Sequence, residues 1–389
     1  MATPELRVPD PYRLAAVARL CESADPYRLD DSLFVEAMRE AVTWHRDRSP
    51  FYRERLARAG FTPEGLRTLA DALETPFVLA SFFKMHEILS VPREQISVHL
   101  TSSGTTGQKS QIFFDDWSIS AAQRMVEFIF NAEGWNTPET AVNYLLYTYE
   151  SGLAAGLGTS FTDHFLTRFA PVHRAFTALR RTGTGGTEFD PFGCIETLRS
   201  YEKEGRPVRI FGFPAFLHFT LQRMRELELP PLLLHPESFV FLGGGWKGQA
   251  SQAIDKRALY REIAIGLGIP DQRIRDGFGA VEHCVPYIEC ARHEFHVPTW
   301  SRVVIRDLRT LAAVGFGERG FLQFVSPYIT SVPAISVLMG DLASLHPPEA
   351  CGCGTPTPFF VVHGRAGTSR NQSCAIAAAQ LIKAEVAAR

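Results

Sequence analysis

The 389-residue sequence lacks the features that usually mark a membrane protein or a nucleic-acid-binding protein. It contains no apolar run that approaches the roughly 20 residues of a membrane-spanning helix. Its formal net charge is −2, whereas a nucleic-acid partner usually requires a basic surface. Residues 1–13 have no basic segment followed by an apolar one, as a signal peptide has, so we expect a cytoplasmic protein.

Cysteine is scarce, and internal repeats and low-complexity segments are absent. In a cytoplasmic protein the 7 cysteines are expected to be thiols, metal ligands or nucleophiles rather than disulfides. Apolar residues make up 45% and charged residues 21%, which is typical of a globular chain with a sizeable core. The 29 phenylalanines also suggest an apolar pocket, for which residues 142–165 and 211–219 are candidate walls.

The N-terminal part of the chain is expected to be helical after an irregular start. Residues 1–30 are rich in Pro and Asp and are expected to wrap over the surface. Apolar residues at helical spacing predict a helix over residues 31–58, with a break before Pro50. Asp116 is the expected N-cap of a further helix over residues 117–131.

Strand-like and helix-like segments alternate through the middle of the chain. Apolar runs predict strands at 142–149, 208–213 and 238–243, and helical patterns occur at 194–204, 215–228 and 252–266. This alternation predicts βαβ units around a largely parallel sheet. After residue 274 the segments become shorter and richer in β-formers, which predicts a second, more antiparallel subdomain.

A glycine- and hydroxyl-rich loop lies between two apolar β-type runs at residues 99–114, HLTSSGTTGQKSQIFF. Glycines allow the backbone N–H groups of such a loop to converge on an anion, while hydroxyls and a lysine add donors and charge. A simple flexible turn is the alternative interpretation. Walker spacing is absent, which disfavours a GTPase-like protein. The residues predicted to bind phosphate are Ser102, Ser103, Gly104, Thr105, Thr106, Gly107 and Lys109.

The TSSGTTGQKS segment resembles the phosphate-binding signature of adenylate-forming enzymes, which join a carboxylate to AMP before passing it to an acceptor. The resemblance implies ATP as a substrate and an α/β fold of mostly parallel sheets flanked by helices. It implies an adenylation domain over residues 1–362, with a smaller β-rich subdomain at about 285–362. Residues 363–389 are then expected to form a short C-terminal tail.

The segment DGFGAVEH, residues 276–283, resembles the aromatic-Gly-x-Thr-Glu motif of the same enzymes. By this resemblance Phe278 and Gly279 contact the adenine, and Glu282 holds Mg²⁺ between phosphate oxygens. Val281 stands where many members have threonine, so the resemblance does not carry over the phosphate hydrogen bond of that threonine. A glycine turn with a surface glutamate is the alternative interpretation.

Further nucleotide contacts are implied by the resemblance at three places. Glycines at the end of a parallel strand let a flat base approach the backbone, so Gly243, Gly244 and Gly245 are expected to form one wall of the adenine pocket. A tight turn after the strand is compatible with this. Asp341 matches the aspartate that binds the ribose hydroxyls, and Arg365 matches the arginine at the hinge into the C-terminal part.

Two pairs of soft ligands give an independent metal-type signal. Cys290 and His296 are spaced as C-x5-H, and Cys351 and Cys353 form a C-x-C loop. Together they can supply a closed tetrahedral site, so we expect structural zinc that joins the late β-rich subdomain to the large one. His293 and Cys284 are alternative ligands, and four unligated loop residues are the remaining alternative. The same arrangement occurs in phenylacetate–CoA-ligase-like and acyl-protein-synthetase-like members.

The C-terminal segment TSRNQSCAIAAAQ contains Cys374 at the start of a predicted helix. The helix dipole and nearby Arg370 would favour a thiolate, which is a competent nucleophile toward an acyl-adenylate. A buried structural cysteine is the alternative. The chain stops 24 residues after Arg365, whereas most adenylate-forming enzymes continue for a further domain that supplies a catalytic lysine. This ending resembles the acyl-protein synthetases of bacterial luminescence systems, in which a C-terminal cysteine accepts the acyl group.

The resemblance therefore implies an ATP-dependent acyl-protein synthetase whose carboxylate is a fatty acid. Its acyl group would pass to Cys374 and then to a protein acceptor such as a reductase or a carrier protein. One alternative is an acyl- or aryl-CoA ligase, or a carrier-protein ligase, with the same adenylation step. The other is a scaffold that has retained the fold without catalysis.

Overall fold

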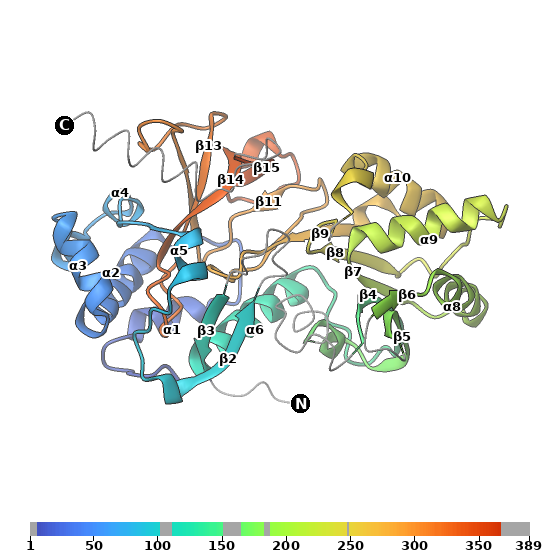
Figure 1. Cartoon of the computed structure of the whole chain (residues 1–389), viewed down its shortest axis with the longest axis horizontal. Helices are drawn as coiled ribbons and strands as arrows, with labels where there is room; N and C mark the ends of the chain where they lie inside the picture. Colours follow the sequence, from blue (N-terminus) through green and yellow to red (C-terminus); the bar gives the residue numbers. More distant parts are fainter. Residues whose placement is uncertain (1–5, 102–110, 151–164, 183–186, 247–248, 367–389) are drawn as a thin grey trace. The chain divides into compact units, whose positions relative to one another are not determined.

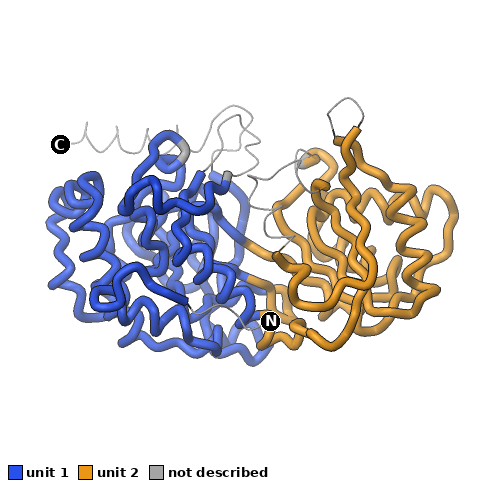
Figure 2. Tube along the Cα trace, turned by 90° about the horizontal axis from the view of Figure 1, so that it is seen from below, with its two compact units in different colours: residues 1–129, 279–287, 294–389 blue, residues 130–278, 288–293 orange. Residues whose placement is uncertain are grey.

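The computed structural model describes residues 6–101, 111–150, 165–182, 187–246 and 249–366 (Figure 1). The chain divides into two compact units (Figure 2). Unit 1 comprises residues 1–129, 279–287 and 294–389, and unit 2 comprises residues 130–278 and 288–293. Unit 1 is thus assembled from segments on both sides of unit 2 in the sequence.

Unit 2 is built on a seven-stranded sheet of order β10-β9-β8-β7-β4-β5-β6. Parallel pairing joins β9 to β8, β8 to β7, β7 to β4 and β4 to β5, and β6 is antiparallel to β5. This confirms the predicted parallel sheet. The strands are β4 (Val142–Tyr149), β5 (Val172–Arg181), β6 (Thr187–Phe189), β7 (Val208–Gly212), β8 (Phe239–Gly243), β9 (Ile274–Phe278) and β10 (Tyr287–Ile288).

Three long helices accompany this sheet, namely α8 (Pro191–Glu204), α9 (Pro214–Glu226) and α10 (Lys256–Leu267) (Figure 1). Each helix contributes buried apolar side chains to one cluster, for example Leu198 from α8, Leu221 from α9 and Ile263 from α10. The same cluster contains Ile210 of β7 and Val240 of β8. Burying a side chain of this size contributes roughly 1.5–3 kcal/mol, so the cluster explains why the helices pack on the sheet.

The ends of these helices follow local sequence signals. Helix α8 ends as predicted at Gly205, whose φ of 67° lies in the left-handed region that glycine adopts without strain. Helix α10 begins four residues later than predicted, because the side chain of Asp255 accepts the N–H of Ala258 at 3.0 Å. Residues Ala250–Gln252 form a separate 3-10 turn, η4, so the predicted start at residue 252 is wrong.

Unit 1 contains a six-stranded sheet of order β11-β15-β14-β13-β12, with β1 beside β14. Its long strands pair antiparallel, as predicted for the late part of the chain, and β1 pairs parallel with β14. The strands are β1 (Val78–Leu79), β11 (Phe295–His296), β12 (Arg302–Arg306), β13 (Arg319–Val325), β14 (Ser336–His346) and β15 (Phe359–Arg365). A separate two-stranded sheet pairs β2 (Ile96–Thr101) with β3 (Gln111–Asp115).

The helices of unit 1 lie mostly in its N-terminal part. They are α1 (Ala15–Cys21), α2 (Asp31–Arg48), α3 (Pro50–Arg58), α4 (Leu69–Leu73) and α5 (Ala80–Met85), and α6 (Asp116–Ala132) begins here as well. The break before Pro50 is confirmed. The irregular wrap predicted for residues 1–30 is wrong, because α1 buries Val17 and Leu20 and donates two N–H groups to the Glu40 carboxylate. In the described part of the chain no helix is long and apolar enough to span a bilayer.

Candidate functional site

The predicted phosphate-binding loop, residues 102–107, lies outside the described residues, as do Lys109 and Cys374. The strands that flank the loop are described. Thr101, the last residue of β2, is opposite Gln111, the first residue of β3. Asp115, at the end of β3, accepts the N–H of Ser118 at 2.8 Å and so caps α6, one residue before the cap predicted at Asp116.

The glycine turn after β8 lies beside the end of β9 in unit 2. Gly243 ends β8 opposite Gly277 of β9, and Phe278 is the last residue of β9. Gly244 and Gly245 have φ values of 74° and 64°, which is a backbone that favours glycine. The carboxyl ends of two neighbouring parallel strands therefore bring the predicted base-binding turn and the partly exposed Phe278 together.

Glu282 lies in the turn that follows β9 and is only 4% exposed. The N–H groups of His283 and Cys284 both donate to the carbonyl of Ala280, at 3.0 and 2.7 Å. The alternative of a surface glutamate is therefore wrong. A carboxylate held in a fixed and mostly buried turn has the chemistry of a ligand for a hard cation.

The side chain of His283 anchors this turn in the core of unit 1. Its ring stacks on Phe324 at 4.5 Å, its Nε2 is 2.9 Å from the Tyr287 hydroxyl, and its carbonyl accepts from the Tyr328 hydroxyl at 3.1 Å. Burial lowers the pKa of His283 to about 3, so the ring is neutral near pH 7. No local sequence pattern indicates this anchor, because its partners Phe324 and Tyr328 are distant in sequence.

Asp341 and Arg365, the residues matched to the ribose and hinge positions, are directly opposite each other on β14 and β15. Arg365 Nε donates to Asp341 Oδ1 at 3.3 Å. The structure thus brings these two predicted residues together.

The four predicted metal ligands form one cluster. Single ligand atoms of Cys290, His296, Cys351 and Cys353 all lie within 4.8 Å of one another. In a tetrahedral zinc site with Zn–S bonds of about 2.3 Å, neighbouring ligand atoms are about 3.5–3.8 Å apart. The cluster therefore has a donor set that zinc binds, and its atoms are close enough together to hold one metal ion.

Hydrogen bonds from neighbouring groups orient the donor atoms of this cluster. His296 Nδ1 is 2.7 Å from the carbonyl of Thr357, which fixes Nε2 as the nitrogen that faces Cys353 Sγ at 3.2 Å. Burial lowers the pKa of His296, although the Thr357 carbonyl raises it, so the ring is in the neutral form that binds metals. A backbone N–H also donates to Cys353 Sγ from Thr355 at 3.4 Å, which favours a thiolate.

Neither alternative ligand belongs to the cluster. His293 Nε2 is 2.9 Å from Asp271 Oδ2, and its ring packs against Tyr260. Cys284 is outside the group and is half-buried, and desolvation raises the pKa of its thiol to about 12. The prediction that His293 or Cys284 could replace one of the four is therefore wrong.

A buried carboxylate network in unit 2 was not predicted. Glu289 is 1% exposed and accepts from Tyr260 and from the backbone of Asp276, and it also contacts Lys256. The available signal was a charged residue inside the apolar β-type run of residues 287–290. The residues that donate hydrogen bonds to it, Asp276, Tyr260 and Lys256, lie 13, 29 and 33 residues away, so local spacing does not identify them.

The network predicts a pH dependence of stability. Burial, and then the charge of Glu289, raise the pKa of Asp276 from 3.8 to about 7. Burial also opposes ionisation of Glu289, but contacts with His293 and Lys256 lower its pKa overall. Between about pH 4 and pH 7 the folded state therefore holds a proton on Asp276 that the unfolded chain has lost. The contribution of Asp276 to the free energy of unfolding consequently declines as pH rises from about 4 to about 7.

We expect Asp276→Asn to be more stable than the wild type at pH 8, by on the order of 1 kcal/mol, and to lose much of this advantage at pH 5. Asparagine keeps the oxygen that accepts the Gly277 N–H but cannot ionise. Urea unfolding of both proteins at several pH values measures the difference. A difference in stability that does not change between pH 5 and pH 8 would contradict the prediction.

The architecture is the fold seen in solved CoA ligases. The solved 2-hydroxyisobutyryl-CoA ligase in an open conformation, with 2-HIB-AMP and CoA, matches with a TM-score of 0.63 at 16% identity. The match covers 87% of this chain and 70% of that chain. The same enzyme in its postadenylation state also gives a TM-score of 0.63, and at these identities the likeness shows the fold.

The family follows from the sequence comparisons: the chain belongs to the acyl-protein synthetase, LuxE, family, whose model matches residues 17–382. The long-chain-fatty-acid–luciferin-component ligase of Aliivibrio fischeri is 26% identical over 361 residues, which is 90% of this chain and 88% of that protein. The Vibrio harveyi ligase of the same name is 23% identical over 348 residues, covering 89% and 87%. The phenylacetate-coenzyme A ligase of Thermus thermophilus is 24% identical over 330 residues, covering 82% and 66%. The protein is therefore an acid–thiol ligase of the AMP-forming type.

Proposed function

We propose that this protein uses ATP to activate a fatty acid as an acyl-adenylate, takes the acyl group onto Cys374 as a thioester, and passes it to a partner protein. The observation that carries the proposal is the family match over residues 17–382, which includes Cys374. Two relatives that match at least 89% of this chain are named as long-chain-fatty-acid ligases. The proposed division is an adenylation domain over residues 1–362 and a tail over residues 363–389.

In the first step a carboxylate oxygen attacks the α-phosphorus of ATP, and the bond to the β-phosphate oxygen breaks to release pyrophosphate. Residues 102–107 and Lys109 are proposed to bind the phosphates, and Asp341 to accept from the ribose hydroxyls. The turn at Gly243–Gly245 and the ring of Phe278 would hold the adenine. Glu282 would hold Mg²⁺, which supplies positive charge to the phosphates when bound.

In the second step a thiolate attacks the carbonyl carbon of the acyl-adenylate, and the bond to the phosphate oxygen breaks to release AMP. Among the six described cysteines, burial raises the pKa of Cys21, Cys194 and Cys284, so these are un-ionised thiols at neutral pH. The other three described cysteines belong to the Cys/His cluster. These observations support the seventh cysteine, Cys374, as the proposed nucleophile.

The Cys/His cluster is proposed to hold structural zinc. We expect Cys353→Ser to lose the bound zinc and to lower the melting temperature by on the order of 5–10 °C, because a closed zinc site contributes directly to folding stability. Metal content after dialysis and a thermal melt measure the two effects. Cys284→Ser is the matched control, since this thiol lies outside the cluster, and it should retain the metal. Equal zinc content in the two variants would contradict the site.

The proposed function is tested by exchange of labelled pyrophosphate into ATP in the presence of fatty, aryl and amino acids. We expect exchange with long-chain fatty acids, followed by a mass increase of the protein equal to one acyl group. Exchange without covalent labelling would favour the second candidate, a coenzyme A ligase, which the phenylacetate-coenzyme A ligase relatives support. Absence of exchange with every acid would favour a scaffold that has kept the fold.

A further inference from the structure

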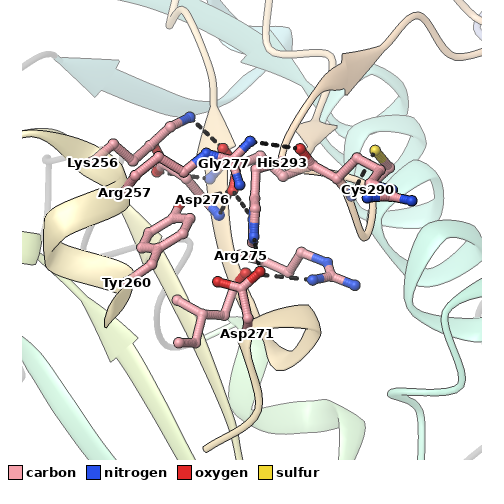
Figure 3. A network of polar contacts seen from close by, with 12 residues as sticks. Lys256, Arg257, Tyr260, Asp271, Arg275, Asp276, Gly277, Cys290 and His293 are labelled. Carbon is pink, nitrogen blue, oxygen red and sulfur yellow. Dashed lines mark hydrogen bonds and ion pairs between the residues drawn. The ribbon is translucent and has the colours of Figure 1, made fainter. Parts of the chain in front are cut away.

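We propose that Glu289 is a positioning residue that fixes two functional segments at once, the end of β9 that carries Phe278 and the turn that carries Cys290. The inference rests on the proposed function, because it assigns nucleotide binding to the first segment and metal binding to the second. All of its contacts lie within unit 2. Figure 3 shows the surrounding residues, with Asp276 and Gly277 near Lys256 and Tyr260.

The Glu289 carboxylate is buried and accepts donors on both oxygens. Oε2 accepts the Tyr260 hydroxyl at 2.7 Å and the backbone N–H of Asp276 at 2.9 Å, and Oε1 accepts from Lys256 Nζ. The Glu289 side chain is fully buried, whereas that of Lys256 is 42% exposed. A buried carboxylate is stable only when such donors satisfy it, so these contacts define its position closely.

On the β9 side, Glu289 contacts both polar groups of the Asp276 backbone. Its carboxylate accepts the Asp276 N–H, and its own N–H donates to the Asp276 carbonyl at 3.0 Å. The side chain of Asp276 in turn accepts the N–H of Gly277 at 2.9 Å. Glu289 thus holds Asp276, and the side chain of Asp276 holds Gly277, the residue before Phe278.

On the metal side, the chain turns from Glu289 through Cys290 to His293. The N–H of His293 donates to the carbonyl of Cys290 at 2.9 Å, and its Nδ1 is 3.4 Å from Glu289 Oε2. His293 has a φ of 65°, which is unfavourable for a residue with a Cβ and persists only where its surroundings determine it. His293 Nε2 is 2.9 Å from Asp271 Oδ2, whereas Nδ1 contacts the Glu289 carboxylate without forming a hydrogen bond.

The same turn presents the sulfur of Cys290. The N–H of Arg292 donates to Cys290 Sγ at 3.3 Å, and the guanidinium of Arg257 donates to the carbonyl of Arg292 at 3.1 Å. A metal ligand on a turn whose conformation is already fixed loses little conformational freedom when it binds the metal. Glu289 is the one residue of this network that contacts both the β9 backbone and the His293 ring.

Glu289→Gln tests the inference with a minimal change of shape. An amide has one oxygen, so its NH₂ group must face either Lys256 or the two donors at Oε2. We expect the dissociation constant of a non-hydrolysable ATP analogue to rise about tenfold, the effect of one unsatisfied buried group. We also expect faster loss of zinc to a chelator. Calorimetry and metal analysis on the full chain measure the two quantities.

Two further variants separate positioning from general destabilisation. Asp271→Ala removes a contact to His293 alone, so we expect faster zinc loss with unchanged nucleotide affinity. Glu202→Gln is the matched control, because its carboxylate also accepts a backbone N–H in unit 2, from Leu233 at 2.7 Å, and it should change neither quantity. Tyr260→Phe removes only one donor to Oε2. It should lower both nucleotide affinity and zinc retention, but by less than Glu289→Gln does.

The outcomes separate this inference from the proposed function. A wild-type protein that binds no nucleotide overturns the proposed function and the inference with it. A wild type that binds nucleotide but no zinc overturns the inference alone. The inference alone would also be overturned if Glu289→Gln and Tyr260→Phe both kept the nucleotide affinity and zinc retention of the wild type. Loss of nucleotide affinity in Asp271→Ala equal to that in Glu289→Gln would indicate general loosening of unit 2 and would also overturn it.

Discussion

Replacing Cys374 by serine is expected to abolish the covalent acyl-enzyme while exchange of pyrophosphate into ATP stays within about twofold of the wild type. The serine hydroxyl is a weak nucleophile at neutral pH, whereas adenylation does not involve this side chain. Intact mass after incubation with ATP and fatty acid measures the first effect. Sensitivity of the acyl group to hydroxylamine identifies it as a thioester.

The control for this experiment is Cys194→Ser. Burial raises the pKa of Cys194 to about 12, and its neighbours Tyr147 and Thr220 can hydrogen-bond to a serine in its place. This variant should be acylated as the wild type is. Acyl thioester that still accumulates on Cys374→Ser would refute the second half-reaction and leave adenylation intact.

Glu282→Gln is expected to lower the rate of pyrophosphate exchange by about 10²–10³, because the amide keeps the shape of the side chain but loses the charge that binds a cation. The concentration of Mg²⁺ that gives half-maximal exchange should rise as well, which distinguishes loss of a metal ligand from a general fall in activity. Titration of Mg²⁺ at saturating ATP and fatty acid measures this shift.

Glu318→Gln provides the comparison for Glu282→Gln within unit 1. The carboxylate of Glu318 is exposed and accepts the N–H of Gly315 at 3.1 Å in a turn, so its replacement should leave exchange unchanged. Equal rates and equal Mg²⁺ dependence for Glu282→Gln and the wild type would show that the buried turn after β9 has a structural role only.

Prediction from the sequence succeeded where the signal is local. Pro50 separates α2 from α3, Gly205 ends α8, and the apolar run at Val142–Tyr149 forms a central strand of the parallel sheet. Each of these outcomes depends on backbone geometry or side-chain periodicity within a few residues. Helix α1 was missed because its first N–H groups are satisfied by Glu40, which lies more than 20 residues away.

In the candidate site, too, residues with a local sequence pattern were predicted and residues that depend on distant partners were not. The spacing of Cys290, His296, Cys351 and Cys353 suggested a common site, and the structure places their donor atoms together. Glu289 could not be assigned in this way, since a single acidic residue in an apolar run has no local pattern that specifies its partners. Its donors come from α10 and β9, and only the folded chain brings them to one carboxylate.

By itself, the sequence determined the class of chemistry, because ligand types, glycine-rich turns and motif order are properties of short segments. It also determined the alternation of strands and helices, since hydrophobic periodicity is local. The tertiary structure alone decided which soft ligands cluster, that Glu282 is buried, and that Asp341 is opposite Arg365. These are relations between segments distant along the chain, and they arise when burial of apolar faces selects one packing of the whole.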